Sequence, residues 1–167
     1  MFIRELGREE CQKLLEQTGF GRLACVRDGE PYIVPLFFAS SPSCLYGFST
    51  LGQKIDWMRS NPRVCIEVDE VRGPCEWTSV ILRGRYEEFS DTPDHAAERL
   101  QAQSKLEHVR SLWWQTGLAS VQTRARFDRD ITIFYRIHIQ EITGRRASAD
   151  PVARVEERRD LDAMSTN

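Results

Sequence analysis

The sequence has no long apolar segment and no closely spaced pair of cysteines. No stretch of the 167 residues holds enough uncharged apolar residues to span a bilayer, and the start, MFIRELGREE, is charged from Arg4 onward, unlike a secretory signal. The five cysteines are odd in number and never form a C-x-x-C pair, which argues against a disulfide framework and a zinc site. We therefore expect a cytoplasmic protein without a membrane partner, in a compartment that keeps thiols reduced.

The sequence also lacks a strong charge of either sign. Its 23 Lys and Arg residues against 25 Asp and Glu residues leave a net charge of -2, which gives no overall basic field for a nucleic acid. The three histidines, His95, His108 and His138, stand apart from other ligand-type residues, so we expect no metal site. The nucleotide-binding patterns G-x-x-x-x-G-K-[ST] and G-x-G-x-x-G are absent as well. Any anion site must therefore be local.

What the sequence does contain is a series of short strands separated by turn residues. Two apolar runs flank Asp28-Gly29, the strongest short-range signal for a hairpin. Residues 63–71 alternate apolar and polar side chains, residues 77–89 continue with Gly84 as a bulge or bend, and residues 131–142 alternate again. The pattern predicts a mainly β fold with peripheral helices, in which the strands form a closed antiparallel barrel without free edges.

Three helices are expected around these strands. Residues 9–17 place apolar side chains at helical spacing before Gly19, and a short amphipathic stretch begins at Lys54 and stops at Asn61-Pro62. A third helix begins with Thr92 as its N-cap and Pro93 at its first position. The predicted apolar face of this third helix comprises Ala96, Ala97, Leu100, Leu106 and Val109.

These elements are expected to form one domain over residues 1–145. A chain of this length can bury roughly two thirds of its unfolded surface in a single core. Residues 146–167 shift to a polar composition with too few apolar side chains to pack a helix firmly. We expect this C-terminal tail to be mobile or docked on a partner.

The stretch STLGQK, residues 49–54, has the composition of a phosphate site. If a strand ends here and a helix begins, the first N–H groups of the helix lack partners and the helix dipole adds partial positive charge. Ser49 and Thr50 offer hydroxyl groups, Gly52 allows close approach of the backbone, and Lys54 supplies a full charge. The alternative is that Thr50 only caps the helix while Lys54 points into solvent.

The order of several short motifs resembles one known family. GRLA, an Asp-Gly turn, PYIVPLFF, LYGFST, G-x-K-I-D, N-P-x-V, W-x-S-V, G-R and I-x-E-I-T-G-R follow one another between about Gly21 and Arg145. This order is similar to that of the pyridoxamine 5′-phosphate oxidase-like proteins, which are FMN-binding antiparallel split β-barrels. The resemblance is to their nitroimidazole-reductase-like subset, except that Phe48 stands where that subset has a histidine.

The resemblance implies a homodimer that holds FMN in clefts at the subunit interface. It places the phosphate at residues 49–54 and the flavin ring along residues 34–37, with two further residues on a strand near the cleft. Pro35 fits such a place, because an edge or bulge that interrupts strand pairing leaves backbone groups free to bond the ring. The alternative there is an ordinary edge strand with Phe37 and Phe38 packed. The implied cofactor-binding residues are Val34, Pro35, Leu36, Phe37, Ser49, Thr50, Lys54, Trp77 and Ser79.

Two functions follow from the resemblance. The first is an FMN-dependent oxidoreductase that passes electrons from a nicotinamide donor to a small-molecule acceptor. The cofactor carries the chemistry in such enzymes, so no acid-base motif is required of the sequence and no catalytic residue is identified. The alternative is a protein that binds FMN without turnover, for storage or sensing, because a fold does not fix a function.

Overall fold

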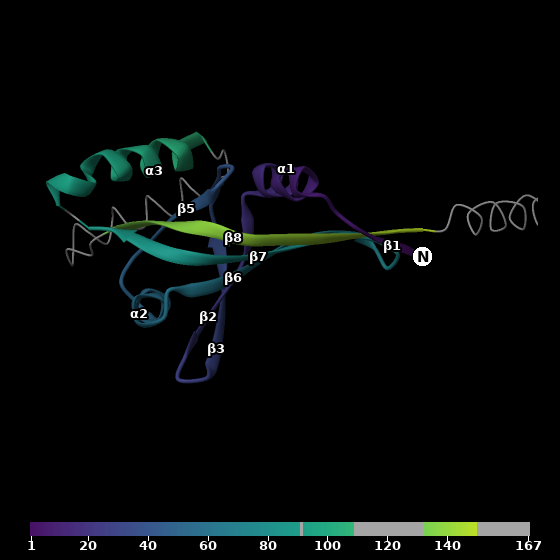
Figure 1. The fold of residues 1–167 in the computed structure, drawn as a ribbon, viewed down its shortest axis with the longest axis horizontal. Helices are drawn as coiled ribbons and strands as arrows, with labels where there is room; N and C mark the ends of the chain where they lie inside the picture. Colours follow the sequence, from purple (N-terminus) through teal and green to yellow (C-terminus); the bar gives the residue numbers. More distant parts are fainter. Residues whose placement is uncertain (91, 109–131, 150–167) are drawn as a thin grey trace, which may run out of the picture.

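A computed structural model describes residues 1–90, 92–108 and 132–149. An antiparallel sheet with helices packed against it makes up most of this part of the chain (Figure 1). The helices are α1 (Arg8–Thr18), α2 (Gln53–Ser60), the 3₁₀ turn η1 (Pro93–His95) and α3 (Ala96–His108). The strands are β1 (Phe2–Glu5), β2 (Phe20–Arg27), β3 (Glu30–Phe37), β4 (Ala39–Ser40), β5 (Cys44–Ser49), β6 (Arg63–Gly73), β7 (Glu76–Phe89) and β8 (Ile133–Ser148).

The sheet is split rather than closed. Its strands pair in the order β3-β2-β6-β7-β8-β5-β4, and β1 pairs with β8 off this path. In the described residues, β3 and β4 do not pair with each other, so the expected closed barrel is wrong and the split barrel is correct. The edge strands explain this result, because β4 has only two residues and Pro31 and Pro35 remove two donors from β3. The edge position predicted for Pro35 is confirmed.

The long strand β8 connects two regions of the sheet. Its first half, from Ile133 to His138, pairs with β5, and its last residues, from Arg145 to Ser148, pair with β1. In Figure 1, β8 runs beside β7 along the length of the molecule, with α1 and α3 on one side and α2 on the other. Because β5 leads into α2, β8 joins the region around α2 to the region around β1.

Two local predictions about backbone shape are confirmed. Asp28 and Gly29 have positive φ angles of 53° and 85°, the geometry of a two-residue type I′ hairpin turn. The register of β7 and β8 shifts at Gly84, which is the predicted bulge. A Cβ atom on Gly84 would lie 2.5 Å from the backbone oxygen of His138, so this close approach requires glycine.

The larger of two buried apolar clusters in the described residues joins the sheet to α1 and α2. The period-2 pattern of β6 buries Val64, Ile66 and Val68 as predicted, and α1 and α2 add apolar side chains to the same cluster. Burial of this apolar surface is the main stabilising contribution to the fold. Further members of the cluster are Cys11, Leu14, Leu15, Leu23, Ile55, Met58, Leu82, Tyr135 and Ile137.

The apolar face predicted for α3 is confirmed at Leu106 and wrong at Ala96, Ala97 and Leu100. Ala96 and Ala97 are exposed and Leu100 is 68% exposed, whereas Ala102 and Leu106 are buried against β5 and β8. All of these residues lie in the α-helix Ala96–His108, where successive residues turn by about 100°. Ala96, Ala97 and Leu100 therefore lie on the side of α3 opposite to Ala102 and Leu106. The prediction for Val109 lies outside the described residues.

The boundary predicted between the domain and the tail differs by a few residues. β8 continues to Ser148, and residues 146–148 pair with β1, a strand that the sequence patterns did not predict. Residues 150–167, the rest of the expected tail, lie outside the described residues. Among the described helices, none has the length and apolar character needed to cross a membrane.

Candidate functional site

The turn between β5 and α2 leaves a helix start without a side-chain cap. β5 ends at Ser49, opposite Ile133 of β8, and α2 begins at Gln53 after three intervening residues. Its N-cap is Gly52, in an extended conformation, and no side chain bonds to the first turn. The first helical bond runs from the Asp56 N–H to the Gly52 carbonyl oxygen, 3.1 Å away. The alternative that Thr50 caps this helix is therefore wrong, and N–H groups of the first turn lack a side-chain partner.

Lys54 lies in the first turn of α2 and is half-buried. Burial lowers the pKa of its ammonium group, while the nearby Cys25 acts in the opposite direction. Because its side chain is half-buried, Lys54 differs from a fully solvated surface lysine. Within the described part of the chain, its ammonium group has no carboxylate or hydrogen-bond partner. A partly dehydrated cation without a counter-ion is favourable only if an anion comes close to it.

The two hydroxyl groups beside Lys54 are also uncommitted. Ser49 and Thr50 are half-buried, and neither side chain bonds to another described residue. The turn therefore combines hydroxyl donors, backbone N–H groups and one ammonium group. This donor set fits a phosphate, because it offers neutral and charged hydrogen bonds to several oxygens at once.

The edge strand β3 has mixed surroundings. Val34 and Phe37 are half-buried and Pro35 is exposed, whereas Leu36 is buried. Phe37 packs against Phe20, with ring centroids 4.7 Å apart. In the described residues, no strand pairs with the outer edge of β3, so its backbone is available to a planar ligand. The packing named in the alternative is present, because Phe38 is buried and Phe37 is half-buried against Phe20.

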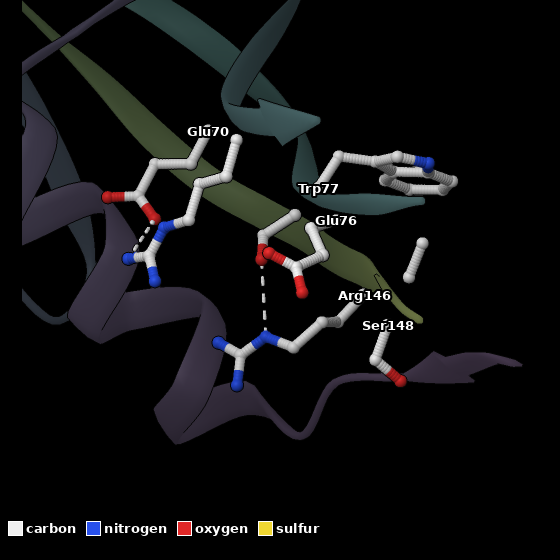
Figure 2. Close-up of a pocket in the computed structure, with 8 residues that line it drawn as sticks. Glu70, Glu76, Trp77, Arg146 and Ser148 are labelled. Atoms are coloured by element: carbon white, nitrogen blue, oxygen red, sulfur yellow. Dashed lines mark hydrogen bonds and ion pairs between the residues drawn. The ribbon is translucent and has the colours of Figure 1, made fainter. Parts of the chain in front are cut away.

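Trp77 and Ser79 lie near the start of β7, which is two strands away from the edge strand pair β2 and β3 in the order of the sheet. Ser79 is opposite Asp69 and donates a 3.3 Å hydrogen bond to Glu67, and Trp77 is opposite Val71. Both side chains line an open pocket of about 450 Å³. Trp77 also borders a second pocket of about 310 Å³, where Figure 2 shows it at the rim and Arg146 within.

One protomer does not bring all these residues together. Lys54 lies near Cys25, which is buried in the core and belongs to a row that continues through Val64 to Gly84. Ser79 is five residues from Gly84 along β7, a separation of about 16 Å. Because strand side chains alternate, Ser79 also lies on the face opposite the buried Val80. Lys54 and Ser79 therefore lie in different regions of one protomer.

A comparison with protein families identifies the chain. The model of the pyridoxamine 5′-phosphate oxidase family matches residues 7–146. The protein belongs to this family. An uncharacterised protein of Rhizobium meliloti is 42% identical over 149 residues, which cover 89% of this chain and 98% of that one.

Solved structures agree with this membership. A crystal structure of a FAD-binding protein from Mesorhizobium loti is 40% identical, has a TM-score of 0.67, and is matched over 89% of this chain and 99% of its own. A FAD-binding protein from Mycobacterium smegmatis is 23% identical, with a TM-score of 0.61 and coverage of 87% and 100%. This second likeness supports the split-barrel fold alone.

Phe48 occupies an apolar place in this family member. It lies opposite Phe134 of β8, with ring centroids 6.4 Å apart, and packs against the cluster under α3. A phenyl ring has no group that ionises or binds a metal, so position 48 offers no acid or base. Phe48, which stands where the nitroimidazole-reductase-like subset has a histidine, therefore cannot take over the chemistry of a histidine.

Sequence reasoning missed an ionic cluster on β7 and β8. The Glu87 carboxylate accepts hydrogen bonds of 2.7 and 3.0 Å from Arg136 and also bonds to the His138 ring. The bonds from Arg136 are the main cause that lowers the pKa of Glu87 to about 2, and the bond to His138 adds to them. The spacing of Arg136 and His138 places both on one strand face, but nothing local in the sequence indicates a partner some fifty residues away.

Proposed function

We propose that the protein is a flavoprotein that binds FMN and passes electrons from a nicotinamide donor to a small-molecule acceptor. One observation carries the proposal: Lys54 is half-buried at an uncapped helix start beside two hydroxyl groups, and none of these groups has a partner among the described residues. The 5′-phosphate of FMN carries the charge and the oxygens that this turn would satisfy.

A related protein supports a flavin as the ligand. The solved structure from Mesorhizobium loti, which is 40% identical to this chain, is named a FAD-binding protein. FMN and FAD share the isoalloxazine ring and the phosphate next to the ribityl chain, so the same turn serves either cofactor. The proposed ring position is the outer edge of β3, where Val34, Pro35 and Phe37 are accessible in part.

The arrangement of the residues favours a cofactor shared between two copies of the chain. Lys54 and Ser79 lie in different regions of one protomer, which supports a flavin that contacts Lys54 of one copy and Ser79 of the other. In a homodimer, one protomer would supply Ser49, Thr50 and Lys54, and its partner would supply Trp77 and Ser79. Sedimentation should then give a dimer, and a monomer that keeps its flavin would contradict the shared cleft.

A bound flavin would supply hydride and electron transfer. The residues of this chain would bind the phosphate at Lys54, orient the ring along β3 and restrict access of water with Trp77. No acid or base is assigned to the site, because Phe48 cannot move a proton. This feature also supports the second candidate function, a protein that binds the flavin without turnover.

The absorption spectrum of the purified protein tests the proposal. We expect visible flavin bands, bleaching on addition of NADH or NADPH, and recovery when an electron acceptor is added. A yellow protein that no nicotinamide reduces would favour the binding function. A colourless protein that does not retain added FMN would contradict both functions.

A further inference from the structure

The pocket beside Trp77 and Ser79 contains a cation that no described group neutralises. This pocket of about 450 Å³ lies between β1, β7 and β8, and we call it the Arg145 pocket. Within the described chain, Arg145 makes no ion pair and no side-chain hydrogen bond. Its guanidinium group is therefore available for a ligand. The residues that shape the pocket are Glu5, Trp77, Ser79, Ile81, Thr143 and Arg145.

Strand register explains why these side chains share one face. Arg145 is directly opposite Ser79 on β7 and opposite Glu5 on β1. Trp77 and Ile81 are two residues away from Ser79 on either side, so both are diagonal neighbours of Arg145 on the same face. The pocket thus places an indole ring and an aliphatic side chain beside a guanidinium group.

The adjacent arginine provides a contrast. Arg146 points to the other face, where its Nε donates a 3.2 Å hydrogen bond to the Thr78 hydroxyl group (Figure 2). Its Nη1 also lies 3.9 Å from Glu10. That face belongs to the smaller pocket with Glu70 and Ser148. Arg146 is committed to groups of its own chain, whereas Arg145 is not.

We propose that the Arg145 pocket binds a planar aromatic carboxylate, which makes an aromatic acid the substrate class of the flavin site. The indole of Trp77 would stack on the aromatic ring, and the Arg145 guanidinium would bind the carboxylate with two parallel hydrogen bonds. The substrate assignment rests on the proposed function, because Trp77 and Ser79 would border the flavin of the partner protomer.

The charges in the pocket favour a carboxylate over a phosphate. A single guanidinium group balances the one negative charge of a carboxylate. A phosphate dianion would keep one charge unbalanced beside the Glu5 carboxylate, which lines the same pocket. Glu5 therefore acts against anions in general, and most strongly against dianions.

Calorimetric titration of the full chain with benzoate tests this inference. We expect Arg145→Gln to weaken benzoate binding by about tenfold or more, and Arg146→Gln to change it by less than about twofold. The neutral isostere benzamide should bind with the same affinity to the wild type and to Arg145→Gln. Removal of the opposing charge in Glu5→Gln should tighten benzoate binding by about twofold.

Each other outcome overturns part of the inference. Equal binding of benzoate to the wild type and Arg145→Gln, or no binding at all, removes the pocket as an anion site. Tighter binding of phenyl phosphate than of benzoate overturns the carboxylate class. FMN affinity is measured in parallel: its loss in Arg145→Gln alone would assign the arginine to the cofactor. A wild type without FMN affinity would refute the proposed function whether or not benzoate binds.

Discussion

Two cations of this chain, Lys54 at the start of α2 and Arg145 near the end of β8, illustrate two ways of holding a charge ready for a ligand. Lys54 is half-buried, and its burial lowers its pKa. Arg145 is exposed and lines an open pocket. The first cation gains more from an anion, because less water competes for it.

Lys54 and Arg145 also differ in the elements that position them. The position of Lys54 is fixed by a short helix that begins soon after β5, so the local sequence is enough to predict it. Arg145 acquires its surroundings from β1 and β7, which are far from it in the sequence. A site at a helix start can therefore be anticipated from a motif, whereas a site on a sheet face depends on pairing.

The largest expected effect is that of Lys54→Met on cofactor affinity. Removing a partly buried ammonium group from the phosphate should cost roughly 1.5 to 3 kcal/mol, or about 10- to 150-fold in the FMN dissociation constant. Riboflavin, which lacks the phosphate, should bind Lys54→Met as it binds the wild type. Lys13→Met, at an exposed position on α1, serves as the control. Equal loss of FMN and riboflavin would mean a general disturbance of the fold.

Mixed dimers test whether Lys54 of one protomer and Trp77 of the other contribute to the same cleft. Lys54→Met and Trp77→Ala should each lower the flavin content when expressed alone. Co-expressed chains should form mixed dimers in which one cleft combines the intact Lys54 of one protomer with the intact Trp77 of the other. Purification with two different tags and measurement of flavin per dimer should give about one flavin instead of two. No recovery in mixed dimers would argue against a cleft shared between protomers.

The affinity for FMN should fall in alkaline solution. Burial lowers the pKa of Lys54 from 10.5, so the free protein loses this charge at a lower pH than an exposed lysine would. The phosphate binds the protonated form, and its affinity therefore decreases as pH rises through the lowered pKa. Titrations across this range should show the decrease in the wild type and a flatter profile in Lys54→Met. Matching profiles would separate Lys54 from the phosphate.

The smallest effect concerns the cluster on β7 and β8, the strands that connect the two regions. The pKa of Glu87 is lowered to about 2 by Arg136 and His138, so its contribution to stability is present above pH 4.5 and is lost as pH falls toward 2. Solvent screening reduces this contribution to about 1 kcal/mol, because the carboxylate is partly exposed. Urea unfolding should show less acid sensitivity in Glu87→Gln than in the wild type. An unchanged pH profile would show that the pair contributes nothing measurable.

Features with a local cause could be predicted from the sequence. Gly19 ends α1 with a φ of 60°, and Asp28-Gly29 forms the hairpin turn, because each rests on the conformational preferences of a few neighbouring residues. The bulge at Gly84 and the helix start before Lys54 belong to the same group. Each of these features is readable within one short segment.

Features that depend on distant pairing could not be predicted. The strand β1 is only four residues long and gains its structure by pairing with β8. The buried face of α3 depends on its packing against β5 and β8, and the link from Glu87 to Arg136 depends on the register of β7 with β8. The open edge of the sheet is likewise set by which strands find partners, and periodicity alone does not reveal it.

The most direct test of the central claim is the ³¹P NMR spectrum of FMN bound to the protein as a function of pH. The second pKa of a free phosphate monoester is about 6. If Lys54 and the helix start hold the phosphate, the bound resonance should stay at the dianion position as pH falls through this value, and Lys54→Met should partly restore the titration. A bound phosphate that titrates like free FMN would contradict the account.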